Sequence, residues 1–128
     1  MQQVSTGVVS LTKQAVRVLV DVVSVYPERN EALINAGVLV LAREASAFPG
    51  FGKVVDDSLN WDVVRVSQEH GILGCGNSAE SVENAFKVGQ KVFIWCQHSC
   101  ITAAAMYVFN VVDEQDVVRE TWVPWKGW

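Results

Sequence analysis

Short runs of β-branched residues, each ended by turn residues, are the feature that most limits what this chain can form. Valines occupy every second position from residue 16 to residue 22, which is typical of a strand. The sequence Pro27-Glu28-Arg29-Asn30 then predicts a turn. Similar runs predict further strands over residues 32–34, 38–42, 53–55, 61–67, 92–100, 106–112 and 117–123. With about seven or eight short strands and at most one helical turn, at residues 81–86, the pattern predicts an all-β barrel or sandwich.

Size and charge narrow the class of protein. The chain has 128 residues, half of them hydrophobic, which suits one globular domain. The formal net charge is -4 and the basic residues are scattered singly, so nucleic acid is not an expected partner. The strongest apolar run, residues 16–26, is interrupted by Arg17 and Asp21, so no membrane span is expected. Three cysteines, an odd number, do not suggest a disulfide framework, and a cytoplasmic location is expected.

Residues 92–100 end in a group of metal-competent side chains. If this segment is a strand throughout, Cys96, His98 and Cys100 lie on one face together with two apolar residues. Thiolate and imidazole are ligands that zinc prefers, so His98 and Cys100 would direct two donors into one cleft. The alternative is structural, because cysteine is often buried and a histidine at the core edge needs no metal.

A second polar group follows residues 61–67. Glu69 and His70 in the sequence Ser67-Gln68-Glu69-His70-Gly71 would hold a water, orient a metal-bound imidazole, or act as acid and base. The alternative is a solvated polar pair at a strand end. Because both polar groups close predicted strands, we expect them at the same rim of one barrel.

Several stretches, taken in order, resemble one known family. They are Val23-Ser24-Val25-Tyr26-Pro27-Glu28-Arg29-Asn30, Ala36-Gly37, Phe48-Pro49-Gly50-Phe51-Gly52, Ser67-Gln68-Glu69-His70-Gly71-Ile72-Leu73, Val88-Gly89, His98-x-Cys100, Val111-Val112-Asp113 and Trp122-Val123-Pro124-Trp125-Lys126-Gly127-Trp128. The set resembles the C-terminal β-barrel domain of the D-serine dehydratase and D-threonine aldolase family, especially its fungal D-serine dehydratase branch. The resemblance runs from about residue 2 to the end of the chain.

The resemblance implies an alanine racemase-like layout, in which a TIM-type barrel carrying pyridoxal phosphate precedes a small β-barrel. It implies that His98 and Cys100 are the protein ligands of a zinc ion that holds the hydroxyl of D-serine. The products would be pyruvate and ammonia, and the complete enzyme would be a homodimer. The thiolate at Cys100 favours zinc and the dehydratase over the D-threonine aldolase alternative. A further alternative is an interaction module that has lost the metal and does not catalyse.

Two departures qualify these implications. Where the family commonly has Pro-Asn before His-x-Cys, this chain has Cys96-Gln97, so Cys96 is either a spare thiol or a competing ligand. A pyridoxal phosphate lysine on a TIM-type barrel is also missing, because that barrel needs about 250 residues. None of the five lysines is a credible cofactor lysine; they are Lys13, Lys53, Lys87, Lys91 and Lys126. We therefore expect a fragment that is not competent alone, with residues 1–14 a lead-in from a missing N-terminal barrel and residues 15–128 the domain.

Overall fold

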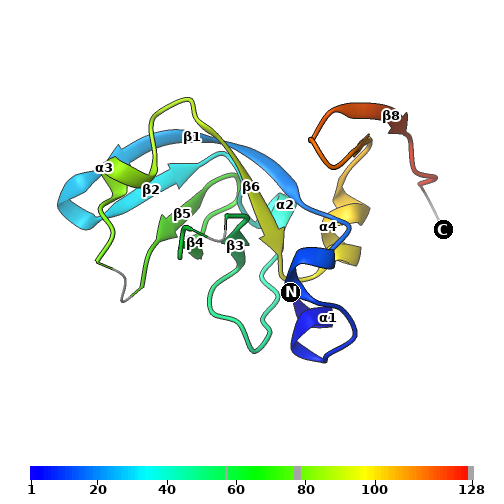
Figure 1. Cartoon of the computed structure of the whole chain (residues 1–128), viewed down its shortest axis with the longest axis horizontal. Helices are drawn as coiled ribbons and strands as arrows, with labels where there is room; N and C mark the ends of the chain where they lie inside the picture. The colour runs from blue at the N-terminus through cyan, green and yellow to red at the C-terminus, as the bar shows by residue number, and fades with distance from the viewer. Residues whose placement is uncertain (57, 77–78, 127–128) are drawn as a thin grey trace.

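Six strands form the body of the molecule in the computed structural model, which describes residues 1–56, 58–76 and 79–126 (Figure 1). They are β1 (Val18–Tyr26), β2 (Glu31–Ile34), β3 (Gly52–Val54), β4 (Asp62–Val66), β5 (Gly71–Gly74) and β6 (Lys91–Cys96). They close into an antiparallel barrel in the order β1-β2-β5-β4-β3-β6. The prediction of an all-β domain built on a small barrel is confirmed.

The remaining elements are short and lie around this barrel. They are α1 (Gln2–Ser5), η1 (Leu11–Lys13), η2 (Pro27–Arg29), α2 (Val38–Leu41), α3 (Val82–Ala85), α4 (Ser99–Ala105), β7 (Phe109–Val112) and β8 (Val118–Trp122). The predicted helical turn at residues 81–86 is present as α3. Within the described residues, no helix has the length and apolar character needed to cross a membrane.

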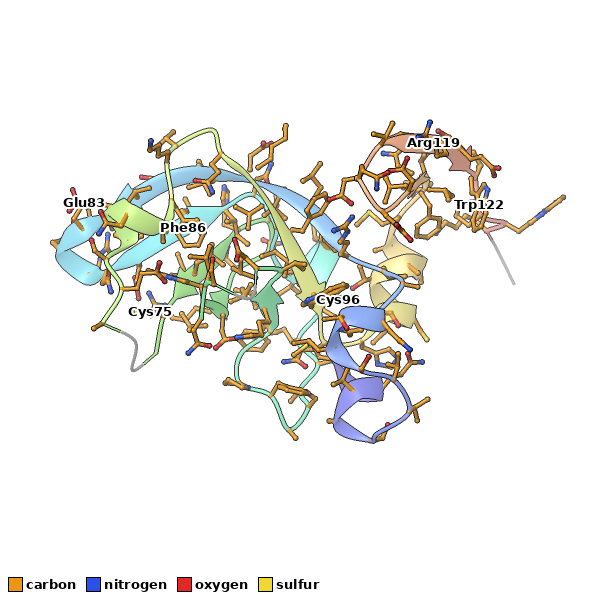
Figure 2. All side chains as sticks on the ribbon, in the orientation of Figure 1. Cys75, Glu83, Phe86, Cys96, Arg119 and Trp122 are labelled. Carbon is orange, nitrogen blue, oxygen red and sulfur yellow. The ribbon has the colours of Figure 1, made fainter. Side chains whose placement is uncertain are left out.

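The alternating valines of β1 form one wall of the core. Val20 and Val22 are buried inside the barrel, whereas Leu19, which precedes Val20, is half exposed. Trp61 and Phe86 pack edge to face inside, with ring centroids 5.0 Å apart. Phe86 follows α3 at the end of the barrel away from α4 (Figure 2). The end of the barrel near α4 is therefore not plugged by this aromatic pair.

Residues 38–41 form helix α2, where the sequence predicted a strand over residues 38–42. Gly37 allows the chain to approach the turn after β4 so closely that Val38 N donates to Ser67 O at 2.9 Å. Leu39 N donates to Gln68 O at 3.2 Å. Since these amide groups bond to a turn instead of a neighbouring strand, the apolar run closes into α2. Strand β5, which pairs with both β2 and β4, was not predicted.

The predicted strand over residues 92–100 is also shorter than expected. Strand β6 ends at Cys96, and α4 begins at Ser99. The sequence of α4 contains three consecutive alanines, the residue with the highest helix propensity. The prediction that strand alternation extends to His98 and Cys100 is therefore wrong.

The β7–β8 hairpin stands beside the barrel (Figure 1). All five residues of β8 are exposed. Arg17, just before β1, forms an ion pair with Asp116 in the hairpin turn and places its guanidinium 4.0 Å from the centroid of the Phe93 ring. One arginine thus links the hairpin to the barrel wall.

Candidate metal centre

His98 and Cys100 lie where the chain passes from β6 into α4. His98 is the N-cap residue of α4 and makes no capping hydrogen bond with its side chain. Cys100 is in the first turn of the helix and is exposed. The helix, not strand alternation, therefore determines how these two residues are presented.

Both residues line one small cavity of about 120 Å³. The opposite wall comes from the first sixteen residues, including Gln2 and Gln14. Cys96 does not line this cavity, because its side chain is 2% exposed and belongs to the barrel core. The structure thus brings His98 and Cys100 together and separates Cys96 from them.

The imidazole of His98 has an unsatisfied nitrogen. Its Nδ1 atom is buried and has no hydrogen-bond partner among the described residues. The nearest charged group is the carboxylate of Glu44, with Oε2 at 3.7 Å from Nδ1. Sequence analysis missed Glu44, because it lies in a loop without a motif and only the folded chain brings it near His98.

Gln97 connects the end of β6 to the loop before β3. Its side chain is 1% exposed, and its Nε2 atom donates to Gly50 O at 2.8 Å. Its Oε1 atom accepts from the hydroxyl of Ser46 at 2.6 Å. A buried amide with these partners fixes the strand end from which His98 follows. Sequence analysis noted Gln97 as a departure from the family pattern and assigned it no role.

Glu69 and His70 lie in the turn between β4 and β5, where both are exposed. The turn is closed by a hydrogen bond from Ser67 N to His70 O at 2.8 Å. Neither Glu69 nor His70 lines the cavity that His98 and Cys100 share. Their contact inside this chain is instead with the start of α2, where Gly37 packs against the same turn.

Comparison with known proteins decides the family. A family model described as "Putative serine dehydratase domain" matches residues 15–112. The chain belongs to this family. The D-serine dehydratase of Saccharomyces cerevisiae is 40% identical over 138 residues, which cover 100% of this chain and 32% of that protein. The domain thus spans about a third of the length of the curated relatives it matches.

Two solved structures share the fold of this serine dehydratase domain. D-threo-3-hydroxyaspartate dehydratase from Delftia sp. HT23 superposes with a TM-score of 0.84 at 25% identity, over 97% of this chain and 35% of that one. An alanine racemase-like protein from Idiomarina loihiensis superposes with a TM-score of 0.82 at 30% identity, over 95% and 34%. The predicted barrel type of the alanine racemase-like proteins is confirmed.

The dehydratase domain offers donors for part of a metal site. Zinc accepts imidazole nitrogen and thiolate sulfur, and catalytic zinc sites usually have three protein ligands and an open position. The described residues contain no group of three or more His, Cys, Asp or Glu side chains placed to hold a metal. His98 and Cys100 would therefore supply two of the ligands that a zinc ion needs.

The residues present do not fit pyridoxal phosphate. None of the five lysines of the dehydratase domain lines the cavity beside His98. Lys53 and Lys91 form ion pairs with Asp62 and Asp21, and Lys126 donates to Ala104 O.

Proposed function

We propose that this chain is the zinc-holding domain of a pyridoxal phosphate-dependent D-serine dehydratase, with His98 and Cys100 as the zinc ligands. The observation that carries the proposal is that His98 and Cys100, two residues with zinc-binding side chains, line one cavity. Membership in the serine dehydratase family and the identity to a relative named D-serine dehydratase support the reaction. The whole enzyme would be a homodimer.

Zinc would supply Lewis acidity, which stabilises the negative charge that develops on the substrate hydroxyl oxygen as it leaves. The chain's own contribution is to hold the ion through one imidazole nitrogen and one thiolate. Gln97 keeps the end of β6 in place, so the two donors remain at the mouth of the same cavity. The net reaction converts D-serine to pyruvate and ammonia.

The rest of the enzyme would carry pyridoxal phosphate and complete the site. The relatives contain about two thirds of their length outside the part that this chain matches. Residues 1–14, which form α1 and η1, would lead in from that part. Cys96 and Cys100 are free thiols, which suits the reducing cytoplasm, where we place the protein.

Metal content tests the proposal directly. After dialysis against excess zinc and desalting, the chain should retain about one zinc ion, measured by mass spectrometry of the metal. His98→Ala combined with Cys100→Ala should abolish retention. His70→Ala and Cys75→Ala are matched controls because His70 is exposed and neither residue lines the cavity. Retention by the double variant, or loss in the two controls, would contradict the assignment.

The alternatives are a D-threonine aldolase-like domain and a barrel that only binds other chains. The thiolate ligand and the identity to D-serine dehydratase favour the dehydratase over the aldolase. One observation favours the interaction module. Four large apolar residues in and next to the hairpin are more than half exposed, namely Tyr107, Val118, Trp122 and Trp125. A metal-free chain that sediments as a stable complex with other chains would support the interaction module.

A further inference from the structure

We propose that Glu44 is a positioning residue for His98. Its carboxylate accepts a hydrogen bond from Nδ1–H of the imidazole and so holds the tautomer that leaves Nε2 for a metal ion. The inference rests on the proposed function, because it takes His98 to be a metal ligand. Its experiment includes a measurement without metal, so that the two proposals are tested separately.

The first observation is the environment of the ring. Nδ1 is buried without a partner, and Glu44 Oε2 lies 3.7 Å away. The imidazole as a whole is 33% exposed, so its exposed part lies away from Nδ1. A buried N–H without a partner is destabilising, and the neighbouring carboxylate can supply the missing acceptor. Nδ1 therefore faces the protein and Nε2 is the nitrogen available to an ion.

The second observation is how the backbone brings Glu44 to this place. Ala42, at the end of α2, has φ 62° and ψ -172°, a conformation that is normally restricted to glycine. This turn directs the following residues away from the helix axis and toward α4. The side-chain amide of Gln2 then donates to Glu44 Oε2 at 3.4 Å and to Ala45 O at 3.1 Å. The backbone conformation of Ala42 and the hydrogen bonds from Gln2 thus both fix the position of residues 44–45.

The distance itself matters to the proposal. A separation of 3.7 Å is slightly longer than a hydrogen bond, so a small rotation of the Glu44 side chain would bring Oε2 within hydrogen-bonding distance of Nδ1. A metal ion on Nε2 makes Nδ1–H a stronger donor and adds positive charge to the ring. The carboxylate of Glu44 is 43% exposed and has room to rotate toward Nδ1. Metal-bound histidines commonly donate their second N–H to a carboxylate in this way.

The experiment compares Glu44→Ala and Glu44→Gln with Glu83→Gln. Glu83 is an exposed glutamate in α3 at the far end of the barrel from Cys96 (Figure 2), so it controls for lost charge. Zinc affinity is measured by competition with a chelator. The tautomer of His98 is measured without metal from the nitrogen chemical shifts of its ring at neutral pH.

In the parent chain His98 should be mainly the Nδ1–H tautomer. Glu44→Ala should shift His98 toward a mixture of tautomers and lower zinc affinity by roughly tenfold or more. Glu44→Gln keeps an acceptor oxygen, so it should retain part of the Nδ1–H preference and part of the zinc affinity. Glu83→Gln should change neither the tautomer of His98 nor the zinc affinity. An unchanged tautomer in Glu44→Ala overturns the inference, even if zinc affinity falls. If the parent chain binds no zinc but its tautomer depends on Glu44, the positioning contact is supported and the proposed function is overturned.

Discussion

Gln97 holds Gly50 through a hydrogen bond of 2.8 Å from its side-chain Nε2 atom to the backbone carbonyl oxygen. This bond joins the end of β6 to the loop before β3, although neither segment has regular structure at that point. Ser46 completes the connection by donating to the same side chain. Because His98 is the next residue, the geometry of the candidate metal centre depends on this buried amide.

Replacing this amide should destabilise the fold. In Gln97→Leu the hydroxyl of Ser46 and the carbonyl of Gly50 lose their buried partner, and we expect the free energy of unfolding to fall by about 2 kcal/mol. Urea denaturation followed by tryptophan fluorescence measures the change. The control is Gln68→Leu at an exposed position, which should change the free energy of unfolding by less than about 0.5 kcal/mol. Equal stability of the two variants would contradict a structural role for the amide.

A methyl group at Gly37 should disturb the contact between α2 and the turn after β4. An added Cβ would lie 2.6 Å from Gln68 O and closer still to Ser67 O, and both are backbone atoms that cannot move away alone. Gly37→Ala should therefore lower the free energy of unfolding by about 1–3 kcal/mol. Thermal unfolding followed by circular dichroism measures it.

The control for this variant is Gly76→Ala, where an added Cβ meets no atom within 4 Å. Its cost should come only from the positive φ of 54° and amount to about 1 kcal/mol. A smaller effect at Gly37 than at Gly76 would show that the close approach of the two backbones is not needed.

The hairpin turn should respond to acid through Asp113. Hydrogen bonds from the backbone N–H of Val117, then from Arg119 and Gln115, hold the pKa of this carboxyl below its ordinary value of 3.8. Because the pKa of Asp113 is lower in the folded chain than in the unfolded chain, the ionised carboxylate stabilises the hairpin at pH values above the ordinary value of 3.8. That contribution is lost as the pH falls through the lower folded value.

Amide exchange at Val117 and the carboxyl carbon shift of Asp113 check this prediction. Both should change together at a pH below 3.8. Asp113→Asn should remove the part of the change in Val117 protection that follows the carboxyl titration, while it keeps an acceptor oxygen in the turn. A carboxyl titration at or above the ordinary value would show that the backbone bonds are absent in solution.

Alone, the chain should not turn over D-serine. No lysine lies in the cavity beside His98, so pyridoxal phosphate added to the purified chain has no residue there with which to react. Pyruvate measured by coupled reduction with lactate dehydrogenase should stay at the level of a buffer blank. Pyruvate formation that requires the chain and disappears in Cys100→Ala would contradict the prediction.

Local pattern predicted most of the barrel and little of the site's geometry. The alternating valines were sufficient to predict β1, because side chains alternate along any extended segment. The end of β6 was not predictable in this way, since Gln97 is fixed by a loop distant in sequence. For the same reason α2 was read as a strand: its first amide groups bond to a turn that only the closed barrel provides.

The candidate site, like the barrel, was only partly predictable from the sequence. His98 and Cys100 were found because their chemistry is visible in the sequence, and the structure places them on one cavity. Their presentation by a helix was missed, as was Glu44, since the contact of Glu44 with His98 depends on the backbone turn at Ala42. Sequence identified the donors, and tertiary structure determines what surrounds them.

The hairpin and the barrel differ in whether their strands have an unpaired edge. Closure gives every barrel strand two hydrogen-bonded neighbours, whereas β7 and β8 are paired only with each other. Each hairpin strand therefore keeps one edge at which another polypeptide can add a strand. Self-association of the purified domain at high concentration would begin at the hairpin, and charged substitutions there would be the first choice for keeping it in solution.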